Sequence, residues 1–412
     1  MGTPGKPFSP STPPAFMQFI NDLCHLPIVA PVAYVGFWSV FCLLSPIGAI
    51  VLLISLPFRV INDLYLCVRA TIYDRINPNN PSPDHAELVV VITGCDTGFG
   101  NDLALKFLTS PPPPCPGCSS SSVTVFALCY SEPGCARVSK QSAGGKAYKS
   151  NRLLPVQCDV TSEASVKGAF SAIEAHVSRP KEGGEKCFLH TVVNNAGKER
   201  GVACSFERDM EVNYFGSIRV IKASLPLIKS QATAASPSSR FVGTCVVNVT
   251  SMAGLCASPN MGSYTGSKHA MEAVSTCLSY ELRPWGCKVT TVNPSFHKTP
   301  LVDGIENFID VMYSQSPVAR SDYGPSYCSA LKSLSVVGSK VCEWRPHNVS
   351  GCIYRQVYHG RGGQLMVGMD ARYAIAVIRH LPADVQRAMV AGWPGAQFYM
   401  GEKPDLCKNK LA

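Results

Sequence analysis

Short apolar runs alternate with stretches of helical periodicity through the middle of the chain. The runs with strand character are 88–93, 123–129, 154–160, 188–194, 241–249 and 287–292, and helical patterns fall between most of them. Strands that alternate with helices at this spacing form parallel βαβ units. The pattern therefore predicts an α/β fold built on a doubly wound parallel sheet.

A longer apolar segment lies near the amino terminus. No charged residue occurs from 26 to 58, which exceeds the roughly 20 residues that one bilayer crossing needs. Pro46 and Gly48 interrupt the segment, so one long tilted span and a hairpin of two short arms both stay open. Arg59 and further arginines follow it, whereas only Lys6 precedes it, so the positive-inside rule puts residues 59 onward in the cytosol. We expect a membrane anchor here.

Composition narrows the functional classes. With 46% hydrophobic and 16% charged residues, the chain is not of the disordered type. The net charge of +9 is not gathered into Lys/Arg runs or an aromatic-interleaved basic stripe, so a mildly basic surface is favoured over nucleic-acid binding. The 19 cysteines are scattered, and "CPGC" at Cys115 and Cys118 has no second pair at zinc-site distance. We therefore expect free thiols and no metal site.

The stretch "VITGCDTGFG" joins the first strand to a helix. The strand ends at Thr93, glycines follow at positions 94, 98 and 100, and a helical pattern begins at once. Bare backbone N–H groups at a helix start can bind a pyrophosphate, and the missing side chains let it approach closely. The spacing is T-G-x-x-x-G-x-G rather than G-x-G-x-x-G, so further motifs must identify the type of site.

Further polar motifs follow in order along the chain. They are "CDV" (158–160) and "NNAG" (194–197) at strand ends, Asn213 in the next helix, Ser251 after the fifth strand, and Tyr264 and Lys268 in "YTGSK". In order and spacing, this set resembles the short-chain dehydrogenase/reductase family over residues 87 to about 300. The resemblance implies a Rossmann-like sheet, a small carboxy-terminal helical cap and an NAD(P)-dependent oxidoreductase that acts on CH-OH groups.

The resemblance assigns catalytic roles to Ser251, Tyr264, Lys268 and Asn213. Tyr264 and Lys268 are four apart on a predicted helix and so share one face. A free phenol has a pKa of about 10, and a nearby ammonium would stabilise its phenolate, so Tyr264 could exchange a proton with the substrate hydroxyl. Ser251 would hold the substrate oxygen. The family further implies that Lys268 contacts the nicotinamide ribose and that Asn213 fixes a proton-relaying water.

The cofactor is expected to bind along the carboxyl ends of the strands. The residues implied are Thr93, Gly94, Asp96, Thr97, Gly98, Phe99, Gly100, Asp159, Val160, Asn195, Ala196, Gly197, Tyr264, Lys268, Pro294 and Thr299. Neither an acid nor a base stands at 129–131 after the second strand, where an acid would favour NAD and a base NADP. Asp96 disfavours a 2′-phosphate, so NAD is favoured while NADP stays open.

Several phrases resemble the retinol and steroid dehydrogenase branch of the family, which includes the mitochondrial 3-hydroxybutyrate dehydrogenase. They include "ITGCDTGFG", "EVNYFGSIRVIKASLPLI" and "ELRPWGCKV", with "DYGPSYC" and "VGMDARYAIAVIRHLP" in the cap. An anchor in the membrane suits a lipophilic alcohol, retinol-like or steroid-like. A small hydroxy-acid dehydrogenase and a catalytically silent cofactor-binding scaffold are the alternatives. We expect the protein to reside in the endoplasmic reticulum membrane with its catalytic domain facing the cytosol. Whether it forms a homodimer stays open.

Three departures from the family pattern stand out. Ser295 replaces the glycine of a Pro-Gly motif, the stretch 198–212 is short, and "VYHGRGGQLM" differs from the usual run in the cap. The predicted segments are an amino-terminal tail (1–25), an anchor (26–58), a linker (59–86), a Rossmann-fold catalytic domain (87–305), a substrate-binding cap (306–390) and a tail (391–412).

Overall fold

The structure is a computed structural model. It describes residues 86–110, 122–180, 186–197, 206–234, 244–258, 261–299, 309–310, 313–314, 344–359, 362–368, 370–375 and 378–391. The predicted tail, anchor and linker up to residue 85 lie outside the described residues, as do 315–343 of the predicted cap. No helix within the described ranges combines the length and the hydropathy that crossing a bilayer requires.

The strands form one sheet, in the order β3-β2-β1-β4-β5-β6-β7. Each neighbouring pair is parallel, as the sequence pattern predicts. The chain runs outward from β1 in one direction and then returns to β4 on its other side, so the switch point lies between these strands, where open α/β sheets bind their ligands. The strands are β1 (Ala86–Thr93), β2 (Ser122–Cys129), β3 (Arg152–Gln157), β4 (Lys186–Asn194), β5 (Cys245–Val249), β6 (Lys288–Pro294) and β7 (Gly363–Val367).

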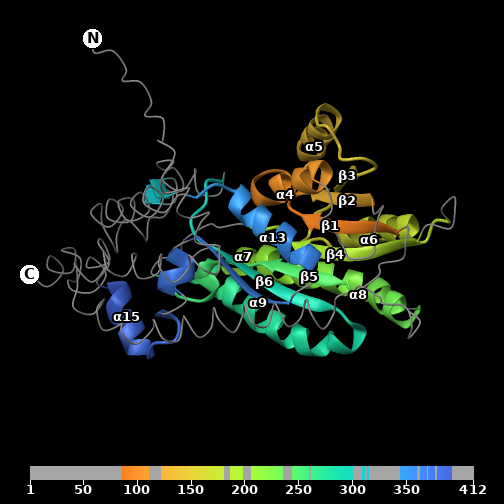
Figure 1. Cartoon of the computed structure of the whole chain (residues 1–412). Helices are drawn as coiled ribbons and strands as arrows, with labels where there is room; N and C mark the ends of the chain where they lie inside the picture. Colours follow the sequence, from red (N-terminus) through yellow and green to blue (C-terminus); the bar gives the residue numbers. More distant parts are fainter. Residues whose placement is uncertain are drawn as a thin grey trace, which may run out of the picture.

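Helices cover both faces of the sheet, and the strands are accordingly apolar on both sides. In β1, Val90 and Ile92 belong to one buried cluster and Val89 and Val91 to the other. Figure 1 shows α4 above the sheet and α9 below it. The main helices are α4 (Gly98–Thr109), α5 (Glu132–Gly144), α6 (Glu163–Val177), α8 (Ser217–Ala234), α9 (Gly262–Glu281) and α13 (His347–His359).

Shorter helical elements complete the described chain. They are α7 (Phe206–Asp209), the π-helical turn η2 (Met210–Gly216), the 3-10 turns η3 (Met252–Gly254) and η4 (Arg283–Trp285), the π-helical turn η5 (Asp370–Ile375) and α15 (Ala383–Ala391). Of the predicted catalytic set, Asn213 lies in η2, and Ser251 directly precedes η3 as its N-cap.

The third strand begins two residues before the predicted run 154–160 and ends three residues before its end. It ends at Gln157, and the chain turns at Asp159, whose carboxylate accepts hydrogen bonds from the backbone N–H and the hydroxyl of Thr161. Ser162 then caps α6. A polar side chain that satisfies nearby backbone groups ends a strand despite the apolar residue beside it. The fifth strand, expected over 241–249, is β5 from Cys245, and 241–243 lie outside the described residues.

The last strand, β7, was not expected from the pattern. It lies in the segment assigned to the cap and pairs in parallel with β6, from Thr290↔Gly363 to Pro294↔Val367. The run "GQLMV" is short and begins on a glycine with φ of 124°, so it has little strand character of its own. The sheet therefore extends beyond residue 305, and part of the predicted cap belongs to it.

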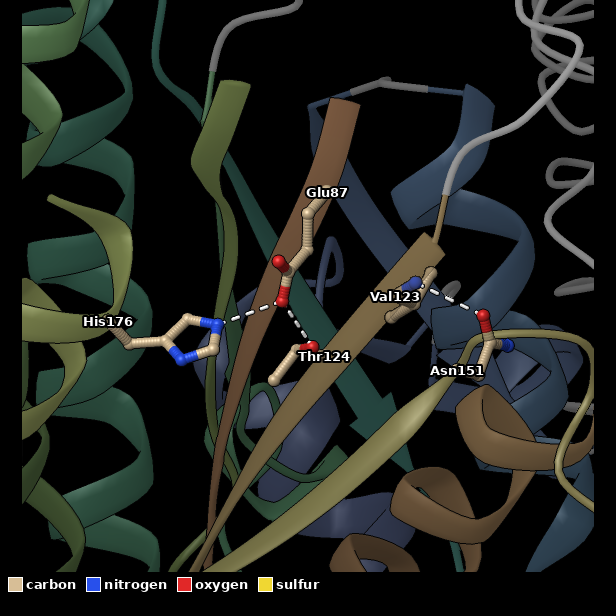
Figure 2. A network of polar contacts seen from close by, with 5 residues as sticks. All are labelled: Glu87, Val123, Thr124, Asn151 and His176. Carbon is tan, nitrogen blue, oxygen red and sulfur yellow. Dashed lines mark hydrogen bonds and ion pairs between the residues drawn. The ribbon is translucent and has the colours of Figure 1, made fainter. Parts of the chain in front are cut away.

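At the amino-terminal end of the sheet, the Asn151 side chain satisfies backbone groups of two neighbouring elements. Asn151 accepts a hydrogen bond from the backbone N–H of Val123 at 3.1 Å (Figure 2). Its amide donates to the carbonyl of Phe107 at 2.9 Å. Val123 lies in β2 and Phe107 lies near the end of α4, so the side chain joins two elements by backbone groups. Asn151 is buried, and these groups would otherwise lose solvent without gaining partners.

Candidate active site

The glycine loop between β1 and α4 adopts the conformation that its glycines allow. Gly94 and Gly98 have φ values of 70° and 63°, in the left-handed region that side chains disfavour. A Cβ atom on Gly94 would also lie 2.8 Å from the backbone Cα of Ala196. The loop is therefore pressed against the end of β4, and its first turn requires glycine for two reasons.

Thr93 and Asn195 fasten the ends of β1 and β4 together. The Thr93 hydroxyl accepts hydrogen bonds from the backbone N–H groups of Asn195 at 3.0 Å and Ala196 at 2.9 Å. The Asn195 side chain donates in return to the carbonyl oxygens of Thr93 at 2.9 Å and Gly94 at 3.2 Å. Thr93 is buried and does not reach the cleft described next, so its part in cofactor binding is to shape the loop.

A cleft of about 820 Å³ opens at the carboxyl ends of the strands, a volume typical of small-molecule and cofactor sites. Most predicted cofactor residues line it: Gly94, Asp96, Thr97, Gly98, Phe99, Asp159, Val160, Asn195, Ala196, Gly197 and Thr299. The predicted cofactor residues that do not line it are Thr93, Gly100, Pro294, Tyr264 and Lys268, and the predicted catalytic residues Ser251 and Asn213 do not line it either. Sequence reasoning missed Cys158, Thr161, Glu207, Arg208, Glu211 and Val212, and it considered Tyr130 only as a neighbour of the second strand.

The cleft-lining residues that the sequence did not predict include a cysteine and several charged side chains. Burial raises the pKa of the Cys158 thiol to about 11, so this cysteine is a neutral thiol at pH 7. The charged side chains come from α7 and η2, and Glu211 is paired with Arg219 at 2.5 Å. α7 and the start of η2 lie within the short stretch 198–212, whose length departs from the family pattern. The motif "EVNYFGSIRV" begins at Glu211 but marked only Asn213 as a site residue, and no motif marked Glu207 and Arg208, because their position depends on how α7 packs.

Asp96 leaves the glycine loop and reaches the carboxyl end of β2. Its carboxylate accepts hydrogen bonds from the backbone N–H of Tyr130 at 2.7 Å, and from the backbone N–H and hydroxyl of Ser131 at 3.1 and 2.7 Å. In many dinucleotide-binding folds an acid at this strand end binds the ribose 2′-hydroxyl. Here the strand end has no acid of its own, and the glycine loop places one there.

Tyr264 and Lys268 lie on the same buried face of α9. The Lys268 ammonium is 5.6 Å from the centre of the Tyr264 ring, and it donates a hydrogen bond to the carbonyl oxygen of Val249 at 3.0 Å. Tyr264 is 8% exposed and Lys268 is 5% exposed. The four-residue spacing predicted this shared face, and Val249, the last residue of β5, supplies the contact that positions the ammonium.

Asn213 adjoins the same helix from a π-helical turn. Its amide donates to the hydroxyl of Ser267 at 3.0 Å, and that hydroxyl donates to the carbonyl of Tyr264 at 2.7 Å. A Cβ atom on Gly197 would lie 3.3 Å from Asn213 Oδ1 and 3.5 Å from Lys268 Nζ. Gly197 lines the cleft, so Asn213 and Lys268 stand directly behind the cleft wall.

Ser251 lies on a turn that packs against α9. It follows β5 and caps η3, with its Oγ accepting a hydrogen bond from the backbone N–H of Ala253 at 3.1 Å. A Cβ atom on Gly254 would lie 3.0 Å from the carbonyl oxygen of Lys268, which shows how closely η3 meets the helix. The structure therefore attaches Ser251 to the element that carries Tyr264 and Lys268.

A polar network that sequence reasoning missed supports Ser251. The Asn293 amide donates to the carbonyl oxygen of Ser251 at 3.1 Å, to the Thr250 hydroxyl at 2.7 Å and to the Glu272 carboxylate at 2.6 Å. The Thr250 hydroxyl also donates to Glu272. Asn293 lies in β6, Glu272 in α9, and Thr250 directly after β5, so the network joins three elements behind the site. Only the strand register and helix packing bring them together.

The segment after β6 tolerates serine in place of the family's glycine. Among the described residues other than glycine, only Lys149 has a positive φ, so Ser295 does not need the conformation that glycine would supply. Its backbone N–H donates to the carbonyl of Val367 in β7 at 2.9 Å. Pro294 is buried at the end of β6, whereas Thr299 reaches the cleft, where it would contact a Cβ atom on Gly98.

Comparisons with known proteins agree with this arrangement. A family profile described as short chain dehydrogenase matches residues 88–309, which is more than half of the chain. The mitochondrial D-beta-hydroxybutyrate dehydrogenase of Bos taurus is 36% identical over 253 residues, or 58% of this chain and 64% of the relative. The chain thus matches slightly less than two thirds of that relative's length.

Other relatives match over more of their length. Human retinol dehydrogenase 5 is 29% identical, over 73% of this chain and 87% of the relative. Human 17-beta-hydroxysteroid dehydrogenase type 6 is 27% identical, over 74% and 88%. A crystal structure of a short chain dehydrogenase/reductase from Burkholderia phymatum in complex with NAD has a TM-score of 0.52 at 21% identity, covering 74% of this chain and 97% of that chain, which supports the fold. The protein therefore belongs to the short-chain dehydrogenase family, in the hydroxybutyrate, retinol and steroid dehydrogenase branch that its motifs resemble.

Proposed function

We propose that this protein is a membrane-anchored, NAD-dependent oxidoreductase that interconverts a lipophilic alcohol and its carbonyl compound. The observation that carries the proposal is the buried pair of Tyr264 and Lys268, whose ammonium lies just behind Gly197 in the cleft wall. An aromatic hydroxyl beside a positioned ammonium is suited to proton exchange with a substrate hydroxyl.

Each member of the predicted catalytic set has a distinct task in this proposal. The Tyr264 hydroxyl takes the substrate proton during oxidation and returns it during reduction, and the Lys268 charge stabilises the phenolate formed in between. Ser251 Oγ accepts from Ala253, which leaves its own proton to donate to the substrate oxygen. Asn213, held by Ser267, fixes a water that carries the proton onward.

The cleft suits a nicotinamide dinucleotide. Two left-handed glycines expose backbone N–H groups at the start of α4, where a pyrophosphate is favoured. Gly94 and Gly98 would face the pyrophosphate, Asp159 the adenine and Thr299 the carboxamide. When bound, the nicotinamide ring supplies the hydride acceptor or donor.

Asp96 supports NAD over NADP. Its carboxylate lies at the end of β2, where a 2′-phosphate would stand beside it, and like charges at short range repel. Arg137 contacts only the main-chain oxygen of Asp96, at 2.9 Å, in this arrangement. We expect the kcat/KM for NAD to exceed that for NADP by roughly tenfold or more, and Asp96→Asn to narrow this ratio. A wild-type preference for NADP would contradict the assignment.

The substrate class rests on the relatives and on the predicted anchor at 26–58. Retinol and 17-beta-hydroxysteroid dehydrogenases are named for lipid-soluble alcohols, which would partition into the bilayer that holds the enzyme. We place the protein in the endoplasmic reticulum membrane with its catalytic domain in the cytosol, and a homodimer stays a prediction. The bovine hydroxybutyrate relative favours the alternative of a small hydroxy acid.

The decisive experiment compares Tyr264→Phe with Tyr280→Phe in the full-length protein. Tyr264 is buried near the cleft, whereas Tyr280 lies on the same helix and is 71% exposed. We expect Tyr264→Phe to lower turnover by at least about 100-fold while NADH fluorescence shows unchanged binding, and Tyr280→Phe to leave both unchanged. Unchanged turnover in Tyr264→Phe would exclude the mechanism, and no turnover in the wild type would favour the scaffold alternative.

A substrate screen separates the two enzyme readings. Retinoids, steroids and 3-hydroxybutyrate are tested in turn with NAD and NADP, and the appearance of reduced nicotinamide is followed by fluorescence. Turnover of a retinoid or steroid supports the proposal. Turnover of 3-hydroxybutyrate alone would replace it with the hydroxy-acid alternative.

A further inference from the structure

Three side chains that can bind metals meet at the amino-terminal end of the sheet, opposite the cleft. They are Glu87 in β1, His176 in α6 and Cys187 in β4, and one ligand atom from each lies within 4.8 Å of the other two. Glu87 is 4% exposed, and its carboxylate lies 2.8 Å from His176 Nε2 (Figure 2). The family's reaction uses none of these residues.

Strand register explains why the three meet. Glu87 and Cys187 are paired neighbours in the parallel ladder between β1 and β4, so their side chains leave the sheet on the same face. That face is the one covered by α6, and His176 occupies the last turn of this helix. Its ring and that of Phe126 form a T-shaped pair with centroids 5.3 Å apart, which limits how the imidazole can turn.

The donor set is the one that zinc prefers. A carboxylate, an imidazole and a thiolate bind Zn²⁺ at about 2.0–2.3 Å, and a water can complete a tetrahedral site. Donors around such an ion stand roughly 3.3–3.5 Å apart, so the Glu87–His176 separation of 2.8 Å needs to widen only slightly. Thr124 donates a hydrogen bond to the Glu87 carboxylate, the kind of outer contact that orients a metal-bound carboxylate.

We propose that Glu87, His176 and Cys187 form a zinc site that joins β1, β4 and α6. When zinc binds Nε2 of His176, the proton on that nitrogen moves to Nδ1, so that the imidazole stays neutral, and the thiol proton of Cys187 goes to solvent. Six residues of extended strand separate Glu87 from Thr93, so the site lies about 20 Å from the glycine loop. The ion would strengthen the amino-terminal end of the sheet and leave the cleft unchanged.

The test uses full-length protein that carries Cys115→Ser and Cys118→Ser, because the "CPGC" spacing could itself bind zinc. After chelation, Zn²⁺ is titrated by calorimetry, and Co²⁺ is added separately as a spectroscopic probe of thiolate coordination. We expect one equivalent to bind, a thiolate-to-cobalt absorption band, and a rise in Tm with zinc.

Two single variants in that background decide the result. Cys187→Ser removes one ligand while it leaves the hydrogen bond between Glu87 and His176, so the variant should fold, lose the cobalt band and bind zinc about 100-fold more weakly or worse. Cys277→Ser, at an exposed cysteine, should behave like its parent. Equal zinc affinity and an intact cobalt band in Cys187→Ser would overturn the proposal, as would no zinc binding by the parent. Dehydrogenase turnover is not part of the readout.

Discussion

The ammonium of Lys268 donates a hydrogen bond to the carbonyl oxygen of Val249, 3.0 Å away. Val249 ends β5 and Lys268 lies on α9, so the contact fixes the lysine head at the junction of sheet and helix. A carbonyl oxygen carries no net charge. This contact therefore positions the ammonium beside the Tyr264 ring without neutralising it, which preserves its ability to stabilise a phenolate.

Lys268→Met should impair proton exchange more than cofactor binding. The methionine keeps the length of the side chain and removes the charge, so we expect kcat to fall by roughly 100-fold and the pH profile to move to higher pH. Lys229→Met on α8, where the lysine lies over the Trp285 ring, removes a charge away from the site and is the matched control. An unmoved pH profile in Lys268→Met would show that Lys268 is structural only.

Gly94→Ala should weaken NADH binding, whereas Gly168→Ala should leave NADH binding unchanged and stabilise the fold. Gly94 has a φ of 70° and no room for a Cβ atom beside Ala196, whereas Gly168 in α6 has open space around it. We expect Gly94→Ala to weaken NADH binding by about tenfold or more, measured by fluorescence titration. Gly168→Ala should bind NADH normally and gain roughly 0.5–1 kcal/mol in the free energy of unfolding. Normal NADH binding by Gly94→Ala would show that the loop does not hold the cofactor.

Asn151→Ala should destabilise the fold without affecting the cleft. The change strips partners from the backbone N–H of Val123 and the carbonyl of Phe107, both buried, at a cost of about 2–3 kcal/mol in urea unfolding. Asn151→Asp keeps the acceptor but loses the donor, so it should also destabilise. Gln157→Ala, at an exposed strand end, should change stability by less than about 0.5 kcal/mol. If Asn151→Ala also lowered the free energy of unfolding by less than about 0.5 kcal/mol, other groups would have to satisfy these two backbone atoms.

His190 should make the protein sensitive to acid. Burial, with a smaller contribution from Lys288, lowers the pKa of His190 to about 4, so the folded state keeps the imidazole neutral. In the unfolded chain a histidine has a pKa of about 6.5. As the pH falls from about 6.5 to about 4, protons bind the unfolded state first, so up to about 3 kcal/mol of stability is lost.

Urea unfolding at pH 7 and pH 4.5 checks the His190 prediction. His190→Asn should show a shallower loss of stability between these values than the wild type, while His269→Asn, on α9, should follow the wild type. Parallel pH dependence in His190→Asn and the wild type would assign the acid sensitivity to other groups.

The sequence predicted those parts of the site that depend on local spacing. The glycines of the loop and the four-residue interval from Tyr264 to Lys268 act within single elements, so their geometry follows from the chain alone. The apolar runs likewise located six strands, with ends that shifted where Asp159 bends the chain back on itself.

Features that depend on contacts between elements could not be predicted from the sequence. Asp96 lies two positions after Gly94, yet its carboxylate accepts a hydrogen bond from the backbone N–H of Tyr130 at the end of β2. Glu272 and Asn293 meet only because β6 packs beside α9. The pairing of Glu87 with Cys187 depends on the register between β1 and β4, and no residue in either strand predicts that register.

The position of β7 has a consequence for synthesis on the ribosome. A nascent chain released as far as Thr299 already contains the glycine loop and all of the proposed catalytic residues, yet β6 still has an open edge, because its partner begins at Gly363. Unpaired edges of parallel strands invite pairing with other chains. Fragments that end between these points would therefore carry all of the proposed catalytic residues with the β6 edge still unpaired, so the sheet is completed only after the active site.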